Sequence, residues 1–244
     1  MRTTQLFWQG RRRYLTIAVV IGVILLSRLG VWQFDRHIQR ITHNQLISDR
    51  MHMTPLPISQ LIVLPSADRD FRRVSAVGQY DAAHQILWRN RSYAGRTGFQ
   101  ILTPLQSDDG AVVLVNRGWV PYESVNTAWS TQFAPPMALQ TVIGVWRESQ
   151  ASSTTVDEAP LVNGWRDKWF LITIPAIQSQ IPLALAPGFI DVQPDGSPQA
   201  ANQPIPIFTT DMGMGSNLSY AIQWFGFAVI LAVGYVVVVG RMRS

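Results

Sequence analysis

The sequence predicts a membrane protein in which two transmembrane helices, one near each end of the chain, flank one mainly antiparallel β domain with short helices. Two observations predict this fold class. Apolar segments occupy residues 15–34 and 218–239, and the region between them alternates short apolar runs with turn residues. A helix needs about 20 apolar residues to cross roughly 30 Å of hydrocarbon, so both segments are long enough to span.

Basic residues flank both apolar segments on their outer sequence sides. Arg11, Arg12 and Arg13 precede the first segment, and Arg241 and Arg243 follow the second. Because arginine and lysine concentrate on the cytoplasmic side of membrane helices, we expect both termini in the cytoplasm. The predicted order is a cytoplasmic basic N-terminus (1–13), a first transmembrane helix (14–35), an extracytoplasmic β-rich domain (36–216), a second transmembrane helix (217–239) and a cytoplasmic basic C-terminus (240–244).

The first apolar segment is predicted to be a retained anchor. Residues 27–30, which follow its apolar part, lack the small-x-small cleavage site of a signal peptide. No long amphipathic leader rich in arginine and serine precedes it, so the expected location is the bacterial inner membrane. The mitochondrial inner membrane is the alternative.

Composition excludes several functional classes. The chain carries a formal charge of +5, partly from the terminal arginines, and no other basic run is interleaved with aromatic residues, so nucleic acid is not an expected partner. The absence of cysteine removes disulfides and thiolate metal sites. The histidines lack metal-ligand spacing, and no nucleophile motif is visible. We therefore expect neither an enzyme nor a metal site.

The first helix is expected to continue outward as a polar stalk over residues 37–51, until Pro55 and Pro57 end it. Residues 57–64 are predicted to form a short helix, which Pro65 stops. Strand-like segments follow at residues 71–80, 85–89, 98–104, 111–120, 139–147 and 169–174.

Residues 106–110 have the composition of a hairpin loop between two of these strands, with Gly110 as the late, left-handed residue. A short helix is expected at 175–181, and an irregular return with one short strand at 189–192. The polar residues 149–158 are predicted to form a loop tip. These elements fit either a barrel or a sandwich.

Four motifs occur in a distinctive order along the chain. They are Leu-Gly-Val-Trp-Gln at 29–33 with Arg36, Gly98 with Thr-Pro-Leu at 103–105, Val-Leu-Val-Asn-Arg-Gly-Trp-Val-Pro at 113–121, and Leu-Ser-Tyr-Ala-Ile-Gln-Trp-Phe at 218–225. With these motifs the chain resembles the surfeit locus protein 1 family over nearly its whole length. The resemblance implies a two-pass membrane protein that assists assembly of haem-copper cytochrome c oxidase, around delivery of haem a to the catalytic subunit.

The resemblance also implies partners and ligands. The expected partners are the lipid bilayer and subunits of cytochrome c oxidase, an enzyme of the respiratory chain. The catalytic subunit is the foremost of these expected partners. The protein would act as an assembly chaperone, with no tightly bound cofactor of its own and haem a bound only transiently. One alternative is a permanent accessory subunit of the mature oxidase without haem handling. Another is a membrane-anchored periplasmic enzyme or sensor, which would need a polar pocket of mutually oriented ionisable groups.

One position departs from the family pattern. The family commonly has a histidine just before the Leu-x-Tyr-Ala string, where this chain has Asn217. An amide does not replace imidazole as a strong iron ligand, so the sequence leaves direct haem binding open. His37 is the histidine nearest the motif residues, and simple solvent exposure is its alternative role.

The motif residues lie on one stripe of each expected helix. Leu29, Trp32, Gln33 and Arg36 follow the i, i+3, i+4, i+7 spacing of a helix face. If both termini are cytoplasmic, this stripe and its counterpart on the second helix lie at the same outer membrane boundary. The counterpart comprises Tyr220, Gln223, Trp224 and Phe227.

Together the stripes could form a small polar and aromatic site near a partner or haem. Gln33 and Gln223 would supply hydrogen bonds, Arg36 would pair with a carboxylate such as a haem propionate, and the indoles would pack on an apolar plane. The alternative is that Trp32 and the other aromatic residues are ordinary interfacial anchors.

Three further residues are docking candidates. Arg28 lies toward the outer end of the first helix, where it either pairs with an acidic group of a partner or extends past Trp32 to the interface. Arg117 and Trp119 belong to the string that closes an apolar strand. They are docking contacts if exposed, whereas a buried Arg117 paired inside the domain is the structural alternative.

Overall fold

The computed structural model describes residues 12–151, 164–194, 203–208, 212–213 and 215–241. The chain divides into two compact units. One contains residues 1–46 and 211–244, and the other contains residues 47–210.

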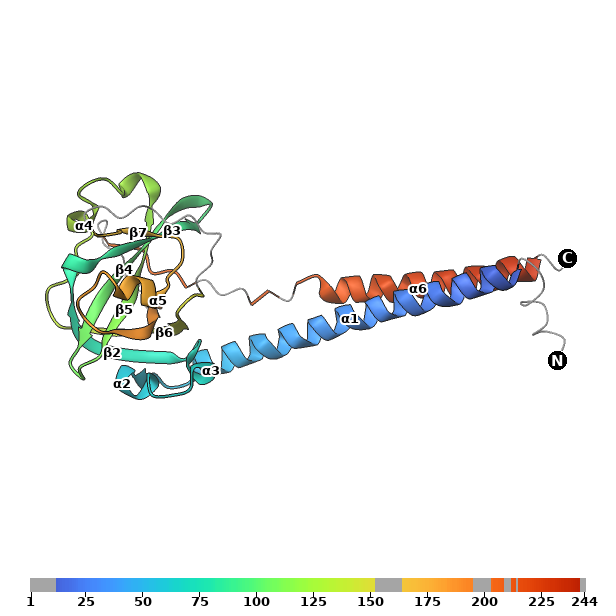
Figure 1. Ribbon diagram of the computed structural model, residues 1–244, viewed down its shortest axis with the longest axis horizontal. Coiled ribbons are helices and arrows are strands. Elements are labelled where there is room, and N and C mark those ends of the chain that lie inside the picture. Colours follow the sequence, from blue (N-terminus) through green and yellow to red (C-terminus); the bar gives the residue numbers. More distant parts are fainter. Residues whose placement is uncertain (1–11, 152–163, 195–202, 209–211, 214, 242–244) are drawn as a thin grey trace. The chain divides into compact units, whose positions relative to one another are not determined.

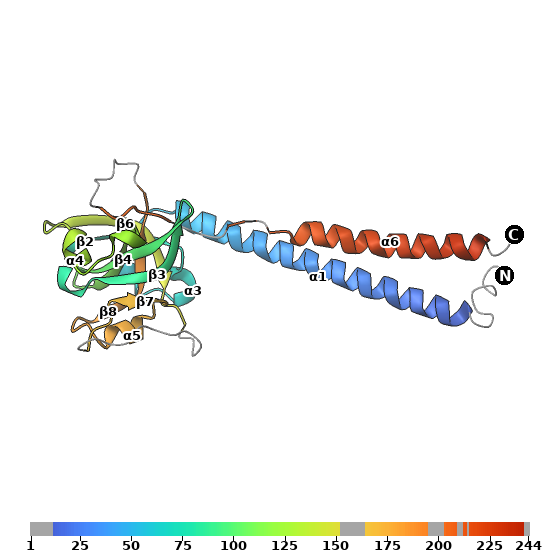
Figure 2. The ribbon, with the colours of Figure 1, turned by 90° about the horizontal axis from the view of Figure 1, so that it is seen from above.

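Helices α1 (Arg12–His52) and α6 (Asn217–Arg241) carry the two apolar segments. Both are long and apolar enough to cross a membrane, which confirms the two predicted helices. Figures 1 and 2 show them side by side and antiparallel. The polar stalk expected at residues 37–51 is the unbroken continuation of α1.

Close packing sets the register of the two helices. Thr16 Oγ1 lies 2.5 Å from the Tyr235 hydroxyl, and a Cβ placed on Gly30 would lie 2.7 Å from the Phe225 ring. Up to residue 46, the α1 residues with restricted exposure are Thr16, Val19, Gly22, Val23, Leu26, Ser27, Gly30, Gln33, His37, Arg40, Ile41 and Asn44. Most of them recur at alternating steps of three and four, which is the spacing of an antiparallel helix seam.

The final turn of α1 belongs to the second unit. Ile47 is buried there, and Arg50 Nη1 donates to the Asp70 carbonyl oxygen at 2.9 Å. Short elements follow at β1 (Leu56–Pro57), α2 (Ile58–Leu61) and α3 (Ser66–Arg69). The helix expected at 57–64 is therefore one turn long.

Five strands form a closed barrel. They are β2 (Arg73–Tyr80), β4 (Arg96–Ser107), β5 (Val112–Pro121), β6 (Gln140–Glu148) and β8 (Leu185–Val192). The neighbour order is β2-β6-β8-β5-β4, and β2 also pairs with β4, so the ring closes. The structure thus selects a barrel over a sandwich. Only β5–β8 is parallel within the ring.

The remaining elements extend or cover the barrel. Strand β3 (Ile86–Tyr93) pairs with β4, and β7 (Lys168–Trp169) pairs in parallel with β3. Short helical turns occur at η2 (Ala82–His84), η3 (Tyr122–Ser124), α4 (Trp129–Gln132) and α5 (Ile174–Gln178). Figure 1 labels β3, β7, α4 and α5 in the same part of the ribbon as the barrel strands.

Most predicted strands are present with shifted ends. The hairpin of β4 and β5 is confirmed, and Gly110 has a φ of 87° in its loop. The strand predicted at 169–174 was too long, because Ile172 bonds to Gln150 and α5 begins at residue 174. Strand β8 begins before the predicted 189–192, and most of the predicted 149–158 loop lies outside the described residues.

Alternate side chains of the barrel strands pack into one core. This cluster includes Val74, Ala76, Leu105, Val113, Val115, Val142, Trp146, Ala186 and Ile190. Such a period of two is the expected signature of strands with one face turned inward.

One carboxyl group is buried in the barrel wall. Asn116 Nδ2 donates to Asp191 Oδ1 at 2.7 Å, and Arg147 Nη1 lies 3.7 Å from Asp191 Oδ2. Burial raises the pKa of Asp191 to about 6. The hydrogen bond from Asn116 and the charge of Arg147 lower the pKa, but burial dominates.

Gly30→Leu should separate the two helices, because overpacking against Phe225 costs about 1–3 kcal/mol. The chain has no cysteine of its own, so Thr16→Cys combined with Tyr235→Cys reports helix proximity through a bifunctional thiol cross-linker long enough to replace the tyrosine side chain. We expect efficient cross-linking in this background and loss of most of it when Gly30→Leu is added. Gly226→Leu is the control, since a Cβ there meets nothing within 4 Å. Equal cross-linking in both would contradict the register.

Asp191→Asn should flatten the dependence of stability on pH. The folded-state pKa of Asp191, about 6, exceeds the ordinary value of about 3.9, so the folded state holds a proton that the unfolded state loses. Its stabilising contribution is present below about pH 4 and is lost as the pH rises through about 6. Between pH 5 and pH 7.5, the free energy of unfolding of the original protein should fall by about 1 kcal/mol relative to that of the variant, as measured by thermal unfolding. Asp108→Asn, at an exposed position, should show no such shift.

Candidate functional site

The predicted stripe on α1 divides between two faces of the helix. Trp32 is 52% exposed, and Arg36 is exposed with its guanidinium 5.8 Å from the Trp32 ring centroid. Leu29 is also exposed, whereas Gln33 is half-buried and lies on the seam with α6. Trp32 and Arg36 therefore point away from the helix pair while Gln33 points into it.

The stripe on α6 divides in the same way. Tyr220 is 47% exposed and Gln223 is exposed, so both face outward. Trp224 is half-buried and packs edge-on against Phe227, with ring centroids 6.1 Å apart. Asn217, the first residue of α6, is half-buried.

Polar side chains fill the part of the α1 seam that is C-terminal to Gly30. After Gln33 and His37, Arg40 Nε donates to the Gly213 carbonyl oxygen at 2.6 Å and Asn44 Nδ2 donates to the Met212 carbonyl oxygen at 2.8 Å. These bonds tie the approach to α6 onto α1. Sequence reasoning did not single out Arg40 or Asn44, although their spacing from Gln33 continues the seam.

His37 is buried in this polar part of the seam. It is 7% exposed, and its Nδ1 has no hydrogen-bond partner among the described residues. The alternative role of simple solvent exposure is therefore wrong for this residue. A buried polar atom without a partner is destabilising by about 1–3 kcal/mol, so such an atom in a native protein is a candidate for contact with a ligand.

The helix register brings His37 level with the start of α6. The contacts of Gly30 with Phe225 and of Arg40 with Gly213 lie on either side of it along α1. His37 lies seven residues beyond Gly30 on α1, and the residue seven positions before Phe225 on the antiparallel α6 is Leu218. His37 therefore lies near the first turn of α6, which begins at Asn217.

The remaining docking candidates have different surroundings. Arg28 is exposed on α1 and forms no ion pair with any described residue. Trp119 is 3% exposed, and its Nε1 donates to the Arg91 carbonyl oxygen at 3.0 Å, so its indole belongs to the domain interior.

Arg117 is half-buried at one end of the barrel. Its Nη1 donates to Gln85 Oε1 at 2.9 Å and to the Phe133 carbonyl oxygen at 2.8 Å, and its Nη2 approaches the Ala134 carbonyl oxygen at 3.4 Å. All of these acceptors are neutral. Burial lowers the pKa of Arg117, yet an arginine remains charged in a protein.

Within the described part of the chain, no group of three histidine, aspartate or glutamate side chains is arranged to hold a metal ion. His37 is the imidazole that the helix-pair seam offers among those residues.

A family model described as the SURF1 family matches residues 20–229. This range contains both the α1 stripe and the α6 motif, together with the whole barrel. The chain belongs to the SURF1 family.

SURF1-like relatives span most of the chain. An uncharacterized SURF1-like protein of Mycobacterium tuberculosis is 25% identical over 221 residues, covering 89% of this chain and 79% of the relative. A SURF1-like protein of Rickettsia felis is 26% identical over 224 residues, covering 91% of this chain and 95% of the relative. Surfeit locus protein 1 of Arabidopsis thaliana is 31% identical over 129 residues, covering 47% of this chain and 34% of the relative.

The family match confirms the resemblance seen in the motifs. SURF1 proteins are known in general as oxidase assembly factors. Bacterial members are among the relatives, and the two apolar helices agree with a membrane protein.

Proposed function

We propose that this SURF1 protein assists assembly of haem-copper cytochrome c oxidase by docking on the catalytic subunit within the membrane while haem a is inserted. Its role is binding rather than catalysis. Family membership supports oxidase assembly in general. The observation that supports the finer role is the division of the motif residues between an outward face and a seam that buries His37.

The exposed motif residues are the proposed docking contacts. They are Trp32 and Arg36 on α1 and Tyr220 and Gln223 on α6. Tryptophan, tyrosine and arginine are the residues that most often dominate binding energy at protein interfaces. A glutamine amide exposed in or near lipid also gains from a partner that accepts its hydrogen bonds.

The proposed orientation follows from charge. Arg13 and Arg241 are exposed at the inner ends of α1 and α6, and positive residues favour the cytoplasmic side. Both termini then face the cytoplasm of a bacterial cell, and the barrel is extracytoplasmic. The docking contacts lie at the outer membrane boundary in this orientation.

We assign transient contact with haem a to His37. Its imidazole is buried, and its Nδ1 has no hydrogen-bond partner among the described residues. It lies near the first turn of α6, where this chain has Asn217 and the family commonly has histidine. Haem iron accepts a histidine nitrogen as an axial ligand. The imidazole would thus be supplied from α1 rather than from α6, and the positive charge of Arg36 would attract a propionate.

Replacing Trp32 should weaken association with the oxidase. Loss of a central tryptophan at an interface costs about 2 kcal/mol or more, which corresponds to roughly 30-fold in affinity. Trp32→Ala should reduce the oxidase that co-purifies with tagged full-length protein and lower the haem a content per oxidase. Ile24→Ala, at an exposed apolar position nearer the inner end of α1, is the matched control. Unchanged recovery and haem a content in Trp32→Ala would sink the docking proposal.

The same purification separates a transient factor from a permanent subunit. An assembly factor is enriched on oxidase that lacks haem a and is absent from the loaded complex. A one-to-one ratio in fully loaded oxidase would instead support the accessory-subunit alternative.

Replacing His37 should weaken haem binding. We expect full-length protein in nanodiscs to bind hemin with a shifted Soret band, and His37→Leu to weaken binding at least about tenfold, or about 1.4 kcal/mol. His43→Leu, on an exposed position of the same helix, should leave the titration unchanged. Adding Asn217→His to His37→Leu should restore the spectrum by returning an imidazole to the same level. Identical titrations for His37→Leu and His43→Leu would contradict the assignment.

A further inference from the structure

The barrel wall has an opening between β6 and the segment that follows β8. Strand β8 ends at Val192, opposite Gly144 of β6, whereas β6 begins four residues earlier at Gln140. Residues 140–143 therefore pair with β2 on one side and with no named strand on the other. Past Gly118, β5 pairs with Ile205 in place of β8.

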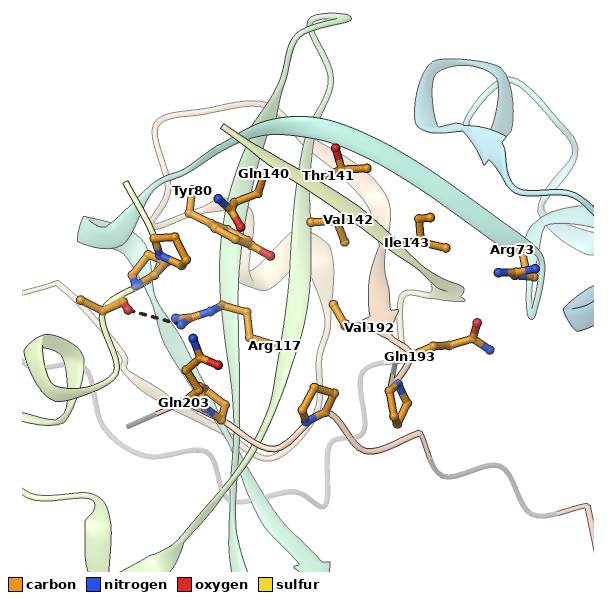
Figure 3. Close-up of a pocket in the computed structure, with 16 residues that line it drawn as sticks. Arg73, Tyr80, Arg117, Gln140, Thr141, Val142, Ile143, Val192, Gln193 and Gln203 are labelled. Atoms are coloured by element: carbon orange, nitrogen blue, oxygen red, sulfur yellow. Dashed lines mark hydrogen bonds between the residues drawn. The ribbon is translucent and has the colours of Figure 1, made fainter. Parts of the chain in front are cut away.

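A pocket of about 650 Å³ occupies this opening. Figure 3 shows Tyr80 and Arg117 at one end of it and Arg73 at the other, with Thr141 and Val142 of β6 between them. The remaining walls are rich in proline, which offers no backbone N–H. These prolines are Pro135, Pro136, Pro194, Pro204 and Pro206.

Hydrogen bonds show which way the β6 backbone faces. The Val77 carbonyl oxygen accepts from Asp108 N at 2.8 Å and Ser107 Oγ at 3.1 Å, so Val77 turns its backbone groups toward β4. Within an antiparallel pair, the opposite residue must then turn its own groups away from β2. Val77 lies opposite Thr141, so the Thr141 N–H and C=O face the opening.

Trp146 supports this alternation. Its backbone N–H donates to the Arg72 carbonyl oxygen at 2.8 Å, and its carbonyl oxygen accepts from Phe71 N at 2.9 Å. Even-numbered residues of β6 thus bond toward the β2 side. Thr141, an odd-numbered residue beyond the end of β8, presents a strand edge with which no described strand pairs. Such edges accept an added strand.

The opening is positively charged. Its described lining contains Arg73 and Arg117 and no aspartate or glutamate. Arg117 donates only to neutral oxygens, and Arg73 Nε is buried without a hydrogen-bond partner among the described residues. Burial raises the pKa of Tyr80 to about 12, so its hydroxyl remains a donor. Two guanidinium groups and a phenolic hydroxyl, with no carboxylate in the described lining, are suited to bind the carboxylate of a ligand.

We propose that this opening binds an extended acidic segment of a partner polypeptide, which pairs with the backbone of Thr141 and places carboxylates on Arg117 with Tyr80 and on Arg73. Charge complementarity selects an anionic occupant, and the strand edge selects an extended peptide over a small acid. The site is independent of the helix pair, so it does not rest on the proposed haem or docking roles.

Synthetic peptides can test the proposal on the full-length protein in nanodiscs. The probe is a fluorescent seven-residue peptide of alternating valine and aspartate with blocked ends, and anisotropy measures its affinity. A version with asparagine for aspartate removes the charge, and a version N-methylated at its central residues removes strand pairing. Succinate supplies carboxylates without a backbone. We expect the acidic peptide to bind at least tenfold more tightly than each of the three.

Three variants locate the bound peptide. Thr141→Pro removes the N–H that faces the opening and leaves the β2 pairing intact, Arg73→Gln removes one charge, and Tyr80→Phe removes only the hydroxyl. Thr141→Pro and Arg73→Gln should each weaken binding about tenfold, and Tyr80→Phe severalfold. Arg96→Gln, an exposed arginine paired with Glu123 at 3.3 Å, should have no effect.

The outcomes separate clearly. Loss of binding in Thr141→Pro and Arg73→Gln, with unchanged thermal unfolding, supports the site. Absence of peptide binding, or equal affinity for the asparagine peptide, overturns it. If succinate displaces the fluorescent peptide as strongly as unlabelled peptide does, the opening is a site for small acids and the proposal is overturned. Undiminished binding of the peptide to Thr141→Pro would exclude strand addition.

Discussion

The arrangement of the helix pair depends on close packing at Gly30. Because glycine lets the Phe225 ring approach the α1 backbone, the two helices have one register. That register aligns Thr16 with Tyr235 near the N-terminal end of α1 and Arg40 with Gly213 farther along the helix. It also decides that His37 is covered. Small residues at such interfaces allow the dispersion contacts and interhelical hydrogen bonds that hold helices together in lipid.

The barrel follows a different constraint, which is closure of the sheet. The β2–β4 pairing removes the edges that an open sheet would expose, but β8 is too short to cover β6 along its whole length. Ile205 instead pairs with β5, where Trp119 N donates to Ile205 O at 2.7 Å. A cationic opening therefore lies beside residues 140–143 of β6, which pair with β2 on one side and with no named strand on the other.

Much of the fold was predictable because its elements have strong periods. The apolar helices, the hairpin at Gly110 and most strands follow from spacing and turn chemistry alone. The site was less predictable. Trp32 and Gln33 were assigned to one stripe, yet one faces outward and the other faces α6. A stripe of residues spans more than 100° of a helix, and the sequence does not show where within that arc the neighbouring helix lies.

The sequence by itself determined two membrane-length helices, a β-rich domain between them and membership of one family, because hydrophobic length, period and motif order are local properties. Only the tertiary structure decided that the sheet closes into a barrel, that Trp119 is interior, and that His37 is buried on the seam of the helix pair. These outcomes depend on pairings between residues far apart in the chain. Such pairings are chosen by packing and by the need to satisfy buried polar groups, which no single segment specifies.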